Sequence, residues 1–354
     1  MTRNILIVIG LLCTVLGAWF IIAESASSRT VTKLKLDEYG VKIPARLKTK
    51  KCLYYEFNIK DGNPERFLSC LDVYEYDHKG NLTEHLGYSA DGDLGSRWIY
   101  KYDKDDNNTE KIWHCPDGRV RCRIYTRYDQ KGRMIKEGRY DESGALTSNY
   151  VYKYNRNNMI EKCGWTLWPS EMELEKLYLK INYRYDPAGK LIEEEQSNGY
   201  SIPDMQTFKT CYKYDTAGKK IEIARYDLSG KLEFKWLRIC NNATSDETVS
   251  YSNGKIIERN RNIYDAKGNW TKESFYEENG DISNSWDRKY DANDNRIEQL
   301  WYKSGKLHME WTYRYDDKNN LIEETKYQRE ETSNEGKRIP IKQAIYKYEF
   351  YPAK

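Results

Sequence analysis

One short motif recurs along most of this chain. It consists of a tyrosine, then an acidic or amide residue, then a turn residue three positions further on. The clearest copy spans residues 128–161, and its first tyrosine belongs to the evenly spaced series Tyr76, Tyr102, Tyr128 and Tyr154. A fixed period, here of about 26 residues, means that one structural unit is stacked on the next, so it constrains the architecture more than any other feature. Residues 52–351 are therefore predicted to form a single repeat array.

Each repeat contains two strand–turn steps. The first column of tyrosines continues to the end of the array as Tyr185, Tyr214, Tyr264, Tyr290 and Tyr315, and its turn glycines are Gly80, Gly132, Gly189, Gly218 and Gly268. Cys240 stands where one tyrosine of this column is missing. A weaker second column lies nearly midway between successive tyrosines of the first, as at Tyr88 and Tyr140. Short strands at even spacing with a turn signal after each one indicate an all-β fold.

The turn residues explain how the strands are joined. In Asp-Pro-Ala-Gly, residues 186–189, the order of residue types is that of a type I turn. A glycine in the left-handed conformation after such a turn completes a common hairpin loop with a bulge, and asparagine tolerates the same conformation at Asn158 and Asn319. We expect an antiparallel β-meander of about twenty strands that forms an extended, twisted or spiralling sheet, preceded by an N-terminal apolar helix.

The composition fits thin sheets better than a thick globular core. The chain has 32 Tyr and 10 Trp, residues that a disordered chain lacks and that pack on one side while meeting water on the other. Its 58 basic and 55 acidic residues are interspersed, for a net charge of +3. Nucleic-acid binding requires basic residues gathered on one face, so we expect no nucleic-acid partner.

The N-terminal residues 1–28 are interpreted as an export segment. Arg3 precedes the uncharged run 5–23, which is longer than the apolar core of most cleaved signals and long enough for a membrane span. Small residues would also permit cleavage before Ala26. The sequence is therefore compatible with either a cleaved signal peptide or an uncleaved single membrane anchor. Either one places the rest of the chain outside the cytoplasm, in the periplasm, at the cell surface or secreted, with membrane contact only through this segment.

The remaining segments are predicted from where the period breaks. Residues 29–51 are expected to be a linker with a first short strand. The period is interrupted in 161–183, in 195–211 and in the charged loop 329–340. Irregular loops on a rigid scaffold are frequent binding positions, so these insertions are candidates.

The motif Tyr-x-Tyr-Asp-x-x-Gly-x-Leu-Ile-Glu, repeated through residues 52–351, resembles that of the YD-repeat (Rhs-like) family of bacterial secreted and surface proteins. The resemblance implies a long β-sheet strip that spirals, in some members into a hollow shell around a toxic C-terminal domain. No such domain is recognisable in this sequence, so a free-standing repeat module is expected. The family also includes carbohydrate-associated members.

Cysteines in an exported protein are expected to pair. Cys52 and Cys70 are symmetric about Asp61, so a hairpin centred there is predicted to place them opposite each other. Cys115 and Cys122 flank another turn and are a second candidate disulfide. Ligand spacing for a metal is absent, and neither a metal nor another cofactor is expected.

No catalytic residues are predicted, because no nucleophile–base–orienter set is recognisable. Rows of exposed tryptophan can stack on sugars or bind a protein. The candidate binding residues are therefore Trp165, Trp168, Trp236, Trp286, Trp301 and Trp311. The same rings can equally serve as a structural ladder that covers the sheet.

The leading hypothesis is an exported, non-catalytic binding or structural module of the bacterial cell envelope that recognises a protein or a carbohydrate. One alternative is a polysaccharide-processing enzyme with its site in the insertions of residues 161–211, where Glu171 and Asp204 are candidate acids. Another is a scaffold for assembling neighbouring envelope proteins.

Overall fold

The computed structural model describes residues 46–60, 63–156, 158–166, 176–197, 207–242, 244–329 and 337–352, all within one compact unit, Pro44–Lys354. The predicted export segment, with its apolar helix, and nearly all of the predicted linker lie outside the described residues.

The described residues form 22 β-strands, which confirms the all-β prediction. Their bounds are β1 Leu47–Lys60, β2 Asn63–Tyr76, β3 Leu82–Ser89, β4 Leu94–Tyr102, β5 Asn108–His114, β6 Val120–Tyr128, β7 Met134–Tyr140, β8 Leu146–Tyr154, β9 Met159–Thr166, β10 Lys176–Tyr185, β11 Leu191–Ser197, β12 Phe208–Tyr214, β13 Lys220–Asp227, β14 Leu232–Asn242, β15 Ser245–Ser252, β16 Lys255–Tyr264, β17 Trp270–Tyr276, β18 Ile282–Tyr290, β19 Arg296–Lys303, β20 Lys306–Tyr315, β21 Leu321–Arg329 and β22 Arg338–Phe350.

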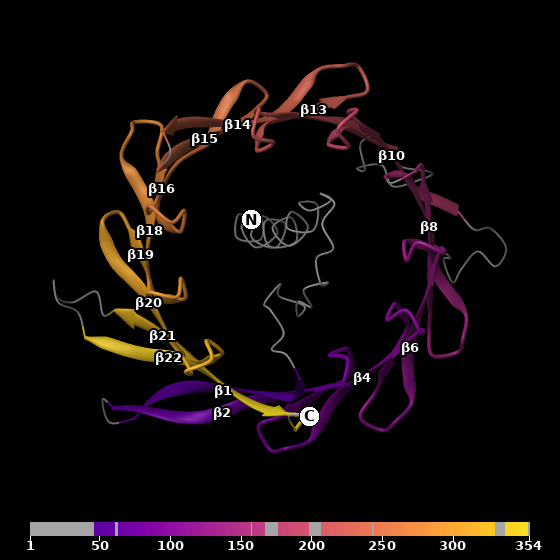
Figure 1. Cartoon of the computed structure of the whole chain (residues 1–354). Helices are drawn as coiled ribbons and strands as arrows, with labels where there is room; N and C mark the ends of the chain where they lie inside the picture. Colours follow the sequence, from indigo (N-terminus) through magenta and orange to yellow (C-terminus); the bar gives the residue numbers. More distant parts are fainter. Residues whose placement is uncertain are drawn as a thin grey trace, which may run out of the picture. The chain divides into compact units, whose positions relative to one another are not determined.

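The sheet closes on itself. Each strand pairs antiparallel with the next one in sequence, and β22 also pairs antiparallel with β1. Figure 1 shows the strands following one another around the resulting 22-stranded barrel, with indigo β1 beside yellow β22. The antiparallel meander is confirmed, whereas the expected extended, twisted or spiralling sheet is instead a closed barrel.

Closure removes the two edges that an open sheet would have. Lys51 of β1 lies opposite Lys347 of β22, and β1 is hydrogen-bonded along its other side to β2. The chain end adds one more bond, since the Tyr351 N–H donates to the Arg46 carbonyl at 2.9 Å. Unpaired strand edges expose backbone donors and acceptors, and a closed sheet has none.

The turns follow the predicted chemistry. At the first one, the Gly80 N–H donates to the Asp77 carbonyl at 2.9 Å, and Gly80 has φ of 76°. The Asp77 carboxylate accepts the N–H groups of Lys79 and Asn81 at 2.9 and 2.8 Å. The left-handed conformation is confirmed at Gly132, Gly189, Gly218, Gly268 and Asn319.

Two further turns reach the left-handed conformation without glycine. Asp106 and Asp294 have φ of 62° and 64°. In each case the side chain is held by the preceding turn of the column: Lys79 Nζ donates to Asp106 at 2.9 Å, and Lys267 Nζ donates to Asp294 at 2.8 Å. At these two positions, where a non-glycine residue has a positive φ, the side chain is therefore also hydrogen-bonded to the neighbouring turn.

The first-column tyrosines form a ladder of hydrogen bonds around one face of the sheet. The Tyr102 hydroxyl donates at 2.7 Å to the carbonyl of Leu82, which begins β3. Equivalent bonds of 2.7–3.0 Å to backbone carbonyls are made by Tyr128, Tyr154, Tyr214, Tyr290, Tyr315 and Tyr348. Outside the column, the hydroxyl of Tyr351 also donates to a carbonyl, at 2.7 Å. Its acceptor is the Tyr76 carbonyl, so Tyr351 links the end of the chain to the first repeat. Burial raises the pKa of Tyr102 to about 12, so this hydroxyl remains a donor well above neutral pH.

The ladder changes where the repeat has degenerated. Cys240 replaces the tyrosine of one copy, and in the next copy Tyr264 donates to the buried Asp246 carboxylate at 3.1 Å instead of to a carbonyl. Asp246 also pairs with Arg238 and accepts a hydrogen bond from Asn262 at 2.8 Å. At this copy, hydrogen bonds to the buried Asp246 carboxylate therefore replace a tyrosine–carbonyl bond of the ladder.

The face opposite the tyrosines carries a belt of ion pairs. The residue between the two tyrosines of the motif points away from them and lies opposite a glutamate on the next strand. Lys101 contacts Glu110 at 2.7 Å, and Lys153 contacts Glu161 at 2.6 Å. The same cross-strand position gives the ion pairs Arg184–Glu193, Lys213–Glu222, Lys289–Glu298 and Arg314–Glu323. We call the two sides of the sheet the tyrosine face and the ion-pair face.

Candidate functional site

Three of the six predicted tryptophans lie side by side on the tyrosine face. Trp286 of β18 is directly opposite Trp301 of β19, and their rings stack with centroids 5.8 Å apart and planes 19° apart. Trp311 of β20 lies 5.4 Å from Trp286 in a tilted arrangement. All three rings are half-buried, so part of each one meets solvent. We call these three residues the tryptophan cluster.

Polar groups border the tryptophan cluster. The His308 ring meets Trp301 edge-on at 5.0 Å, and Lys326 Nζ lies 5.0 Å from the centre of the Trp311 ring. On the side of β17, the buried Glu273 is opposite Trp286 and pairs with Arg288 at 3.3 Å. The cluster therefore offers aromatic surface beside an ammonium group and an already neutralised carboxylate.

A second tryptophan pair was missed by the sequence interpretation. Trp98 of β4 and Trp113 of β5 are opposite each other and stack at 5.3 Å with planes 11° apart. The Arg121 guanidinium lies 4.5 Å from the centre of the Trp113 ring. The signal was present in the sequence, because both pairs have the same internal spacing and begin at the same offset before a first-column tyrosine, Tyr102 or Tyr290.

The other predicted tryptophans are not part of the tryptophan cluster. Trp236 occupies the same place in its repeat as Trp286, but Ile223 and Ser250 lie opposite it instead of an indole. Trp165 of β9 lies opposite Asn149 and Leu177. Trp168 is outside the described residues, as are Glu171 and Asp204.

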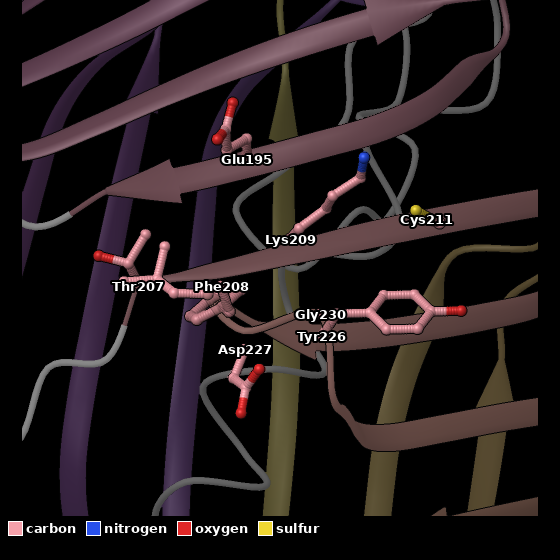
Figure 2. A pocket seen from close by; sticks show the side chains of 9 residues that line it. Glu195, Thr207, Phe208, Lys209, Cys211, Tyr226, Asp227 and Gly230 are labelled. Carbon is pink, nitrogen blue, oxygen red and sulfur yellow. The ribbon is translucent and has the colours of Figure 1, made fainter.

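A pocket of about 430 Å³ opens between β11, β12 and β13, next to one of the predicted insertions. Figure 2 shows Glu195, Lys209, Cys211 and Tyr226 on successive strands around it. Lys209 is held by Glu193, since its Nζ lies 2.7 Å from that carboxylate. By strand register the Glu195, Lys209 and Tyr226 side chains belong to the ion-pair face, so the pocket and the tryptophan cluster lie on opposite sides of the sheet.

The titratable groups of this pocket suit polar binding better than nucleophilic attack. Burial raises the pKa of the Cys211 thiol, which keeps it protonated and a weak nucleophile at neutral pH. The Ser229 hydroxyl donates to the Asp227 carboxylate at 2.6 Å and lowers its pKa, so Asp227 stays ionised. Carboxylates beside the Tyr226 and Phe208 rings can accept hydrogen bonds from a hydroxylated ligand.

The predicted disulfides are not formed. No disulfide joins any of the seven cysteines among the described residues. The hairpin pairs Lys60 with Asn63, and a register shift follows between Tyr54 and Tyr55. Cys52 therefore lies opposite Asp72 and Cys70 opposite Tyr54, so the expectation that these two cysteines face each other was wrong. In the second candidate pair, Cys122 faces Trp113, while Cys115 opens the turn.

Neither a metal site nor a membrane-spanning helix is found in the described residues. Nowhere in these ranges are three His, Cys, Asp or Glu side chains grouped closely enough to hold a metal ion. The same part of the chain contains no helix of the length and apolarity needed to span a membrane.

Comparisons with known proteins give remote structural likenesses. No family model matches this chain, and no curated protein matches it. The crystal structure of TcdB2-TccC3-TEV is 11% identical with a TM-score of 0.29, and the match covers 76% of this chain and 15% of that chain. A porin-like protein from Bacteroides uniformis is 11% identical with a TM-score of 0.29, over 86% of this chain and 97% of that one.

A Tc holotoxin pore from Photorhabdus luminescens with a mutated TccC3 is also similar, at 14% identity and a TM-score of 0.24. That match covers 76% of this chain and 17% of the other. Tc toxin chains are thus among the structural neighbours, and this chain spans only a small part of their length. At such low TM-scores the likenesses support neither a family assignment nor a function.

Proposed function

We propose that this protein is an exported, non-catalytic binding module of the bacterial cell envelope and a relative of the YD-repeat proteins. It recognises a glycan or a protein through tryptophans of the tyrosine face. The repeat motif and the apolar N-terminal run of the sequence support the family and the location outside the cytoplasm.

The observation that carries the proposal is the tryptophan cluster. Trp286, Trp301 and Trp311 come from three adjacent strands, and all three remain partly exposed. The hydrogen bonds of the neighbouring tyrosines already link these strands, so a purely structural role would not require the tryptophans. Half-buried aromatic rings on a rigid scaffold contribute large contact area at small entropic cost, which is why such rings are enriched among binding hot spots.

Binding should be tested with the full chain on a glycan array and in pull-downs from envelope fractions. We expect Trp301→Ala to remove a bound glycan or protein, because this ring lies beside Trp286. Trp236→Ala is the matched control, since this half-buried tryptophan lacks an indole opposite it. Equal binding by both variants, or no ligand in either assay, would contradict the proposal.

A second candidate, polysaccharide processing, is favoured only by the pocket of Figure 2, where Glu195 and Asp227 line one cavity. Release of reducing ends from a surface polysaccharide, abolished by Glu195→Gln but retained by Trp301→Ala, would favour this activity over binding alone.

A further inference from the structure

The two strands at the seam of the barrel extend beyond the point where they pair with each other. The pairing of β1 with β22 ends at Glu56 and Lys342, but β1 continues to Lys60. Residues 57–60 pair with β2, and no strand of the described residues lies along their other edge. Figure 1 shows the indigo β1–β2 hairpin and yellow β22 apart at their tips. The seam therefore leaves one short strand edge open.

Two neighbouring free edges at the seam are blunted, and the edge of β1 is not. The edge of β2 that faces away from β1 contains Pro64 and a bulge at Ser69. The edge of β22 that faces β1 contains Pro340 and a bulge at Ile341. Proline has no N–H to donate and a bulge interrupts the ladder, so both features protect an edge from pairing with another chain. In β1, residues 55–60 pair with β2 in an unbroken register and include no proline.

The open edge, residues 56–60, reads Glu-Phe-Asn-Ile-Lys and is complementary to itself. If two copies run antiparallel about Asn58, Glu56 of each copy lies opposite Lys60 of the other, and Phe57 lies opposite Ile59. Opposite charges and pairs of an aromatic with a β-branched residue stabilise antiparallel strands at directly opposed positions. Every second residue along the edge directs its N–H and C=O away from β2, so backbone hydrogen bonds can form as well.

The side chains of this edge are accessible to a second copy. Ile59 is 54% exposed, which leaves apolar surface uncovered. Within the chain, Glu56 lies 3.7 Å from Lys342, and Lys60 lies 3.8 Å from Glu65. All four of these charged side chains are largely exposed, and exposed ion pairs contribute little to stability. They therefore do not prevent Glu56 and Lys60 from forming ion pairs between copies.

We propose that this edge is a self-association surface, at which β1 of one copy pairs antiparallel with β1 of a second copy. A two-fold axis at Asn58 makes both copies contribute the same five residues, which is the common arrangement in homodimers. Because the contact is a short strand pair, the dimer should be weak and should form as the protein concentration rises. The surface is separate from the tryptophan cluster and its proposed ligand.

Analytical ultracentrifugation of the full-length protein over a range of concentrations measures this dimerisation. Glu56→Lys or Lys60→Glu places like charges opposite each other at both ends of the strand pair. Each variant should dimerise about tenfold more weakly than the wild type. An equimolar mixture of the two variants restores opposite charges at both positions, so it should form a heterodimer at least as tight as the wild-type dimer. Lys306→Glu is the matched control, because Lys306 is an exposed lysine that begins another hairpin strand, β20, and this variant should dimerise as wild type.

Asn58→Cys tests the register of the strand pair. The two-fold axis brings the residues at position 58 of both copies face to face, with Cα atoms about 4.5–5.5 Å apart, a separation that a disulfide can span. Oxidation should therefore link two copies of this variant into a covalent dimer. Lys255→Cys, at an exposed position in β16, is the control and should give no more covalent dimer than the wild type.

Three outcomes would overturn the inference. The first is a wild-type protein that stays monomeric at every concentration and a variant at position 58 that does not cross-link. The second is a dimer that both charge variants leave intact, because another surface would then hold it together. The third is a dimer that the charge variants weaken and their mixture does not restore, because the predicted register would then be wrong. None of these outcomes affects the binding function, which is measured separately through Trp301.

Discussion

The tyrosine ladder yields a quantitative prediction at Tyr102. Its hydroxyl donates to the Leu82 carbonyl at 2.7 Å from a half-buried ring, and Tyr102→Phe removes that hydrogen bond while it keeps the ring. A neutral hydrogen bond of this kind contributes about 0.5–1.5 kcal/mol to the free energy of unfolding. We therefore expect Tyr102→Phe to lower that free energy by about 1 kcal/mol, with an unchanged denaturant slope.

The same reasoning gives the contribution of the whole ladder to the free energy of unfolding. Eight tyrosines, 102, 128, 154, 214, 290, 315, 348 and 351, make such bonds. At about 1 kcal/mol each, their sum is comparable with the total stability of an ordinary domain, about 5–15 kcal/mol. Because each bond has its own acceptor, Tyr102→Phe and Tyr128→Phe should be additive when combined.

The assay is urea denaturation followed by tryptophan fluorescence and far-ultraviolet circular dichroism. Tyr125→Phe is the control, since Tyr125 is 40% exposed and its hydroxyl only accepts a long bond of 3.4 Å from Arg123. If Tyr102→Phe leaves the midpoint where Tyr125→Phe leaves it, the hydroxyl ladder does not stabilise the sheet and the reasoning is refuted.

Three further predictions concern pH, the turns and the half-buried carboxylate of Glu324. Burial raises the pKa of Tyr102, Tyr152 and Tyr313 from 10.0 to about 12, so the neutral form is favoured in the folded chain. Their contribution to stability should be complete below pH 10 and be lost as the pH rises toward 12, and flat stability across that window in alkaline melts would contradict this. Gly268 has φ of 91° with open space where a Cβ would lie, so Gly268→Ala should cost about 1–2 kcal/mol in a urea titration through backbone strain alone; a neutral result would mean that the turn adopts another conformation. Burial raises the pKa of Glu324, so Glu324→Gln should leave the thermal midpoint unchanged or raise it, and a marked fall would reveal a carboxylate that the fold needs charged.

The strands and the turn conformations could be predicted from the sequence, because each of them depends mainly on residues close together in the chain. The tyrosine and turn residues located the strands and the left-handed glycines such as Gly80, whose requirement for positive φ depends only on the turn. Asp106 and Asp294 were not foreseen as left-handed, because the lysines that hold them come from the preceding repeat.

Long-range features could not be predicted from the period. Pairing of β1 with β22 depends on twist and curvature accumulated over the whole sheet, which no single repeat encodes. The hairpin is not centred on Asp61, because Lys60 pairs with Asn63, and the register shift between Tyr54 and Tyr55 moves Cys52 and Cys70 further out of register. Trp98 and Trp113 were recognisable by their offset from Tyr102, but only the pairing of the strands shows that their rings stack.

Closure of the sheet is the central claim, and hydrogen exchange of the native protein tests it without any substitution. In the closed sheet β1 has a partner strand on both sides along residues 49–56, and β22 has one on both sides along residues 342–345, so the amides of these two segments should exchange as slowly as those of β20 and β21. In an open sheet these two strands are edges, and every second amide along them would face solvent. Uniformly slow exchange across both segments is the result the closed sheet predicts, and rapid exchange of about half of their amides would contradict it.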